Sequence, residues 1–155
     1  MTNTPPPSQA DGPPTTEDAE ASRPEIFGAA VASLTSATAR TEVQVEPLRP
    51  PQRLAPYSYA IAAEVRGTDG SEPATGRLVL LHDPDGQEAW DGVLRLVAFV
   101  SAEMDAEIGV DPMLPAVGWS WLTGALDERA AAYRAAGGTV TQTTSTRFGD
   151  IHGPR

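Results

Sequence analysis

The residues that could carry acid–base or metal chemistry are few in this sequence. It has two histidines, His82 and His152, and no cysteine, and all eleven of its basic residues are arginines. The missing cysteines exclude disulfides, thiolate metal sites and cysteine nucleophiles, and the missing lysines exclude Schiff-base chemistry. His82-Asp83 resembles the metal-binding dyad of phosphohydrolases, but that chemistry needs further His and Asp ligands. We therefore interpret His82 as a structural histidine at the end of a strand.

Two further segments resemble functional motifs but are incomplete. Asp83-Pro84-Asp85-Gly86 looks like a fragment of a calcium loop, yet the spaced oxygen donors before the glycine and the later glutamate are not there. We interpret it as a turn that joins two antiparallel strands, with proline and glycine at the positions that favour them. Gly118-Trp119-Ser120-Trp121 lacks the glycine that follows the serine of a nucleophile elbow by two residues.

Three acids alternate after the strongest apolar run. Glu103, Asp105 and Glu107 would line one face of an extended strand, where paired carboxylates can hold Mg²⁺ or share acid–base work. A solvated edge or loop is the simpler interpretation in a chain that is acidic throughout. The sequence therefore predicts no catalytic residue, no metal site and no cofactor.

Two arginines are candidates for binding. Arg95 lies in an otherwise apolar segment between Val93 and Val97 of its own face. A buried guanidinium needs a carboxylate partner or a bound anion, although a structural salt bridge or a reach to the sheet edge would also satisfy it. Arg53 lies in a proline-stiffened connector close to Tyr57, so a cation beside an aromatic ring could contact a ligand or a partner there.

Two tryptophans are the remaining candidates. Trp119 and Trp121 are two residues apart, so on a helix they point in different directions, and we expect one in the core and one exposed. An exposed tryptophan indicates a partner or ligand surface. The candidate set for ligand or partner binding is thus Arg53, Tyr57, Arg95, Trp119 and Trp121.

Charge and hydropathy narrow the class of protein. The formal net charge of −10 repels phosphate, so direct nucleic-acid binding is not expected. No apolar run approaches the roughly 20 residues that cross a bilayer, and the polar, proline-rich start does not resemble a secretory signal. We expect a cytoplasmic protein that does not enter the membrane, and the oligomeric state stays open.

The chain divides into a tail, one domain and a short end. Residues 1–22 are rich in proline, threonine and acids, so we expect a disordered tail. Residues 23–149 form the predicted domain, and residues 150–155 a short polar terminus. A possible capping box of Ser22 and Glu25 precedes apolar residues at helical spacing, which predict a helix over residues 23–39.

Strand patterns dominate the middle of the chain. Alternating or continuous apolar residues predict a short strand that Pro47 stops and three longer ones over residues 57–65, 77–82 and 92–101. The second of these longer strands is apolar on both faces and should be central. A helix over residues 115–136, ended by Gly137-Gly138, and a threonine-rich strand over residues 139–148 complete the series. The order predicts an α+β fold, with two main helices packed on one face of a mostly antiparallel sheet.

Three segments, taken together, resemble an uncharacterised actinobacterial family, domain of unknown function number three thousand. They are PQRLAPY at 51–57, GRLVLLHDP at 76–84, and VGWSWL at 117–122 after Asp111-Pro112. The likeness covers residues 24–149 and brings no established catalytic or binding residues. The genes of relatives tend to lie near one for a ribonuclease D-like exonuclease. The resemblance therefore implies an RNA-related pathway, but it does not imply that the protein contacts RNA.

The end of the sequence departs from that resemblance. Relatives look as though they continue past Phe148-Gly149 into another apolar strand, whereas this sequence ends at Arg155. Whether the strand is absent or the sequence is truncated, we expect a bare sheet edge, which is a natural place for another chain to dock.

Two functions follow from these observations. The first is a non-enzymatic interaction or accessory module that binds a protein partner through a sheet edge, a tryptophan or the Arg53 connector. The second is a small enzyme or ligand-binding protein whose pocket would combine Arg95, Arg53 and the acids after the strand. The second requires a cavity where those groups meet.

Overall fold

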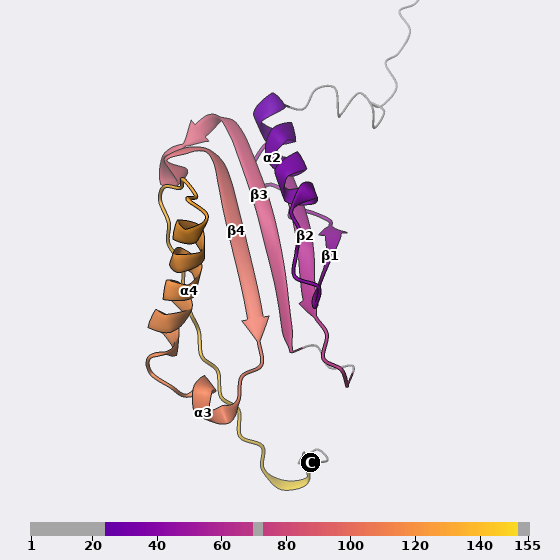
Figure 1. Cartoon of the computed structure of the whole chain (residues 1–155), viewed down its shortest axis with the longest axis vertical. Helices are drawn as coiled ribbons and strands as arrows, with labels where there is room; N and C mark the ends of the chain where they lie inside the picture. The colour runs from indigo at the N-terminus through magenta and orange to yellow at the C-terminus, as the bar shows by residue number, and fades with distance from the viewer. Residues whose placement is uncertain (1–23, 70–72, 152–155) are drawn as a thin grey trace, which may run out of the picture. The chain divides into compact units, whose positions relative to one another are not determined.

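A computed structural model describes residues 24–69 and 73–151 of the chain (Figure 1). The predicted tail and residues 152–155 of the predicted polar terminus therefore lie outside the described residues. The chain divides into two compact units, Met1–Thr38 and Ala39–Arg155. We describe each unit by itself.

The described residues of the first unit form the helix α2 (Glu25–Ser36), inside the range that apolar spacing predicted. Phe27 is its one buried side chain. The hydroxyls of Ser33 and Thr35 donate to carbonyl oxygens one turn earlier, 3.1 Å away, as such residues do within helices. The helix ends because Ala37 adopts an extended conformation with ψ of 136°.

The second unit is built on a four-stranded sheet whose neighbours all run antiparallel. Its order is that of the sequence, β1-β2-β3-β4, so β1 and β4 are the two edge strands (Figure 1). The α+β class and the antiparallel sheet are confirmed. The strands are β1 (Val43–Leu48), β2 (Tyr57–Val65), β3 (Ala74–Gln87) and β4 (Gly92–Ala102).

The buried part of this sheet lies on its two central strands. Ala60 of β2 has no exposed surface, and Leu80 and Leu81 of β3 are each 5% exposed. Because consecutive residues of a strand point to opposite faces, β3 is covered on both sides at this point. The prediction of a central strand here is confirmed. His82 follows, also buried, with its Nδ1 2.8 Å from the carbonyl oxygen of Val93, to which it donates.

The β3–β4 hairpin reverses later than the sequence predicted. The backbone N–H of Asp85 and the side-chain amide of Gln87 both donate to Asp83, and Gly86 has a φ of 74°. These contacts make residues 83–86 an irregularity within β3 and not the reversal, so that part of the prediction is wrong. The reversal lies at the 3-10 turn η1 (Glu88–Trp90), closed by Asp91 in the left-handed region.

The C-terminal part of the second unit is mostly irregular. It contains α3 (Ala106–Gly109), α4 (Leu114–Glu128) and a 3-10 turn, η2 (Gly149–Ile151). The predicted helix to residue 136 is wrong in its end, and the predicted strand over residues 139–148 is absent, since no helix or strand forms there. No helix among the described residues is long and apolar enough to cross a membrane.

A backbone motif explains why α4 stops early. The N–H of Ala131 bonds to the carbonyl of Leu126, and the N–H of Ala130 to that of Asp127. Together with the left-handed φ of 51° at Ala130, this is a Schellman motif that satisfies the last carbonyls of the helix. Glycine usually holds the left-handed position, so the alanine gave no signal, and Gly137-Gly138 is not the cap.

The threonine-rich segment after α4 is held in place by one side chain. Gln142 Nε2 donates to the carbonyl oxygens of Gly109 and Asp111, at 3.0 and 2.9 Å. Both acceptors belong to the α3–α4 connector and not to a strand. The β propensity of this segment is therefore not used for sheet pairing within the described residues.

Candidate interaction surface

The five predicted binding residues do not meet in one place. Tyr57 and Arg95 lie on opposite faces of the sheet, because Tyr57 is aligned through His82 with Leu94, the neighbour of Arg95. Arg53 is exposed in the connector before β2, with a φ of 67°. Tyr57 begins β2, and its ring centroid lies 5.8 Å from that of His82.

Arg95 has a structural contact. Its Nη1 donates to the carbonyl oxygen of Ala89 at 3.3 Å, so the side chain reaches back across the hairpin and holds η1. The sequence left open a salt bridge, a reach to the sheet edge or a bound anion, and the contact found is instead with a backbone carbonyl oxygen of the hairpin turn. No ion pair of Arg95 occurs among the described residues.

Neither tryptophan belongs to the core. Trp121 is 64% exposed, and Trp119 is partly covered because its ring lies against Gly138, where a Cβ would come within 3.2 Å of Cζ3. The expectation of one core tryptophan is wrong. None of the residues of α4 is fully buried.

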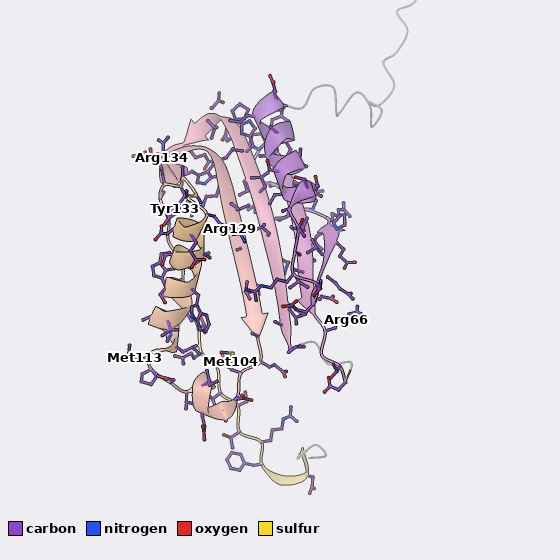
Figure 2. The ribbon with its side chains drawn as sticks, in the orientation of Figure 1. Arg66, Met104, Met113, Arg129, Tyr133 and Arg134 are labelled. Carbon is purple, nitrogen blue, oxygen red and sulfur yellow. The ribbon has the colours of Figure 1, made fainter. Side chains whose placement is uncertain are left out.

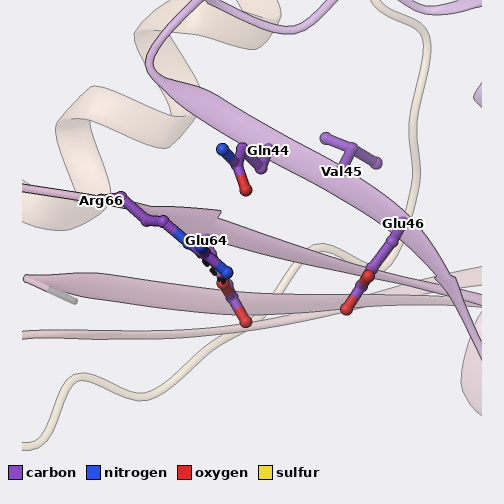
Figure 3. Close-up of a pocket in the computed structure, with 5 residues that line it drawn as sticks. All are labelled: Gln44, Val45, Glu46, Glu64 and Arg66. Atoms are coloured by element: carbon purple, nitrogen blue, oxygen red, sulfur yellow. Dashed lines mark hydrogen bonds and ion pairs between the residues drawn. The ribbon is translucent and has the colours of Figure 1, made fainter. Parts of the chain in front are cut away.

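Two hollows lined by described residues do not gather the candidates. The first, of about 130 Å³, lies over the β1 edge, where the carboxylate of Glu64 binds Arg66 at 3.2 Å (Figure 3). The second, of about 270 Å³, is open and is lined by Arg77, Val79, Val97 and Phe99. No group of three or more potential metal ligands occurs among the residues described.

The surface that stands out is the outer strand β4. Four of its apolar side chains are exposed, with Leu96 and Val97 on opposite faces at 55% and 44% and Phe99 and Val100 at 59% and 72%. Large contiguous apolar patches are uncommon on isolated proteins and mark interaction sites. The guanidinium carbon of Arg77, on the neighbouring strand β3, lies 5.8 Å from the Phe99 ring centroid.

The backbone of β4 is also open on its outer side. The N–H of Glu103 bonds inward to the carbonyl of Pro73 at 2.8 Å, so the ladder with β3 extends one residue past the strand. Backbone groups alternate in direction along a strand, and those of Leu96, Ala98 and Val100 therefore point away from β3. Within residues 24–69 and 73–151, no backbone group bonds them.

The ends of β4 are bordered by the C-terminal part of the chain. At the hairpin, Arg134 lies 3.9 Å from Asp91, and Figure 2 shows Arg134 and Tyr133 close to this turn. At the other end, Met104 follows the strand and is 43% exposed (Figure 2). In the view of Figure 1, α4 lies on the outer side of β4, but no hydrogen bond or ion pair joins α4 to β4 among the described residues.

Sequence reasoning did not identify these residues of β4 as a surface. Leu96, Val97, Phe99 and Val100 belong to an apolar run with the composition of a core strand. The sequence indicates the exposure of these residues only indirectly, because a strand that no further strand follows lies at the edge of the sheet. The expectation of a bare edge used that argument but did not say which strand would form it.

The fold and this surface define a small α+β protein with an unprotected sheet edge and no cluster of three or more potential metal ligands among its described residues. The model of the family described as "Protein of unknown function (DUF3000)" matches residues 23–155. The chain belongs to this family, which confirms the resemblance found in the sequence. No curated protein and no solved structure matches the chain.

Proposed function

We propose that this protein is a non-enzymatic cytoplasmic interaction module that works by binding another polypeptide. The single observation that carries the proposal is the outer strand β4, which exposes apolar side chains on both faces and whose outward backbone groups have no hydrogen-bond partner among the described residues. Such an edge binds an added strand through main-chain hydrogen bonds, and the side chains on its faces supply selectivity. Without a bound polypeptide, an exposed apolar edge of this kind would be a site of aggregation.

The pocket of the competing hypothesis lacks its components. Arg95 donates to a backbone carbonyl, Arg53 lies in the connector before β2, and neither lines one of the two hollows described above. Since the two arginines and the acids share no cavity there, a small-ligand or catalytic function has less support than an interaction function.

Charge favours a polypeptide over a nucleic acid as the direct partner. With a net charge of −10, the chain would repel phosphate over most of its surface. The RNA-related pathway that the family resemblance implies would then involve this protein through a protein contact.

The proposal is tested by making the β4 surface polar. The variant Phe99→Ser/Val100→Thr replaces the two most exposed large apolar side chains of the strand, and Val45→Thr, on the β1 edge with 49% exposure, is the matched control. The full chain is used as bait in extract of its native cells, and bound proteins are quantified. We expect the β4 variant to bind less protein than the wild type, where bound protein includes native copies of this chain. The Val45→Thr control should bind as much as the wild type. Equal binding by all three forms would show the proposal to be wrong.

A further inference from the structure

We infer that the polypeptide bound at this edge is a second copy of the same chain, with the two β4 strands paired antiparallel about Phe99. The inference rests on the proposed function and names its partner. The two sheets would join into one across a twofold axis, which is the commonest symmetry of protein dimers.

The pattern of exposure sets the centre of this pairing. Residues 93–95 of β4 are half-buried, whereas every residue from Leu96 to Ala102 is exposed. The middle of that exposed stretch is Phe99, itself 59% exposed. A twofold axis at Phe99 therefore pairs the exposed stretch with itself, Leu96 opposite Ala102 and Ala98 opposite Val100.

Charge independently supports the same register. Arg95, the one charged residue of β4, lies four residues before Phe99, and Glu103, the first residue after the strand, lies four residues after it. Pairing about Phe99 places Arg95 of each copy opposite Glu103 of the other, which gives two symmetric opposite-charge pairs. Pairing about Val97 would instead place Asp91 opposite Glu103, two like charges.

The hydrogen-bond directions are compatible with this register. The outward-facing residues Leu96, Ala98 and Val100 would exchange main-chain bonds with their counterparts, and β4 contains no proline to interrupt them. Phe99 and Arg95 fall at the alternate positions, where opposite Cα atoms are only about 4.5 Å apart and side chains approach most closely. Those positions suit an aromatic pair and an ion pair.

Phe99 has a cation on the β3 side and is 59% exposed. Arg77 is its partner on β3 and lies over the ring from the inner side. With a second copy, the row across the joined sheet would read Arg77, Phe99, Phe99 and Arg77, with each ring between a cation and another ring. Both kinds of contact with an aromatic ring are favourable.

The chain's own threonine-rich segment is a less suitable occupant. Although residues 139–148 favour strand structure, Gln142 binds them to the α3–α4 connector through two hydrogen bonds. Gly138 is also packed under Trp119. Occupation of the β4 edge by this segment would require the loss of both contacts.

A disulfide experiment tests the register directly, because the chain has no cysteine of its own. The variant Phe99→Cys would place two thiols opposite each other, at a Cα separation that a disulfide can bridge. Ser101→Cys is the control on the same face of the same strand. In the proposed register its two copies lie about 13 Å apart along the strands. Under mild oxidation of the full chain, we expect a covalent dimer from the first variant only; equal yields would overturn the register.

A charge exchange tests the two ion pairs. A strand edge offers less than the roughly 800 Å² per partner of a standard interface, so association is measured by sedimentation up to about 1 mM. Glu103→Arg places two arginines opposite each other at both symmetric sites, and we expect about tenfold weaker dimerisation. The double variant Arg95→Glu/Glu103→Arg restores opposite charges and should recover most of the loss. Failure to recover would contradict the pairing about Phe99.

The result also separates the two proposals. If the wild-type chain stays monomeric at every concentration measured by sedimentation, the second-copy inference is overturned. If the β4-polar variant then still loses a different bound protein, the interaction module stands with another partner. If it loses none, both proposals fall.

Discussion

The two edges of the sheet differ in how they resist pairing with another chain. The β1 edge spans six residues, contains Pro47 and Glu46, and has the Arg66–Glu64 ion pair beside it. The β4 edge spans eleven residues, has no proline, and carries Arg95 as its one charge. Short length, proline and charge are the features by which natural sheets block edge-to-edge association.

The difference indicates that exposure alone does not define a docking edge. Val45 on β1 is 49% exposed, comparable with Val97 on β4 at 44%. What distinguishes β4 is an apolar strand without proline, so its row of outward backbone groups is continuous. In β1, Pro47 has no N–H and interrupts the corresponding row. One sheet thus combines a protected edge and an unprotected one.

The largest expected effect separates the sheet centre from the β4 edge. Leu80→Ala removes a side chain that is 5% exposed, and we expect a loss of about 2–5 kcal/mol in the free energy of unfolding. Its partner in the register, Leu96, is 55% exposed, so Leu96→Ala should cost less than about 1 kcal/mol in the monomer. Urea unfolding at low protein concentration measures both. Similar losses would mean that β4 is covered in solution.

A second prediction converts the β4 edge into one that resembles β1. Ala98→Pro removes an N–H that points outward, whereas Val97→Pro removes one that bonds to β3. We expect Val97→Pro to cost about 1–3 kcal/mol, because it leaves a carbonyl of β3 without its donor. Ala98→Pro should cost less than Val97→Pro while it abolishes self-association.

Urea unfolding and sedimentation of the same two variants check this prediction. If Ala98→Pro proved the more destabilising of the two, the direction assigned to the backbone groups of β4 would be wrong.

The sheet could be predicted because its signals are local. Alternation from Tyr57 to Val65 and the continuous apolar run Leu78-Val79-Leu80-Leu81 identify strands, and short connections imply antiparallel neighbours. The place of a strand in the sheet is not local. The runs before His82 and after Arg95 have similar composition, yet one is central and the other is an edge.

The candidate site was less predictable for the same reason. Arg95 and the tryptophans were singled out by residue type. The contact of Arg95 depends on a hairpin turn that lies later in the chain than the sequence predicted. The contact of Trp119 depends on Gly138, which is distant in the sequence. The end of α4 was missed because residues 131–136 consist mostly of alanine, which favours continued helix, while the cap uses an alanine in a conformation typical of glycine.

The smallest expected effect concerns this left-handed alanine, Ala130, and its measurement also bears on the comparison of the two sheet edges. Ala130→Gly removes the steric cost of a left-handed φ of 51°, so we expect a gain of about 1 kcal/mol in the stability of α4 and its cap. Ala125→Gly, inside the helix, should instead lose about 1 kcal/mol. Hydrogen exchange of the α4 amides measures both changes. If the threonine-rich segment after this cap covers the β4 edge in solution, Ala130→Gly should also alter exchange at Ala98 and Val100; since Gln142 holds that segment elsewhere, we expect their exchange to be unchanged.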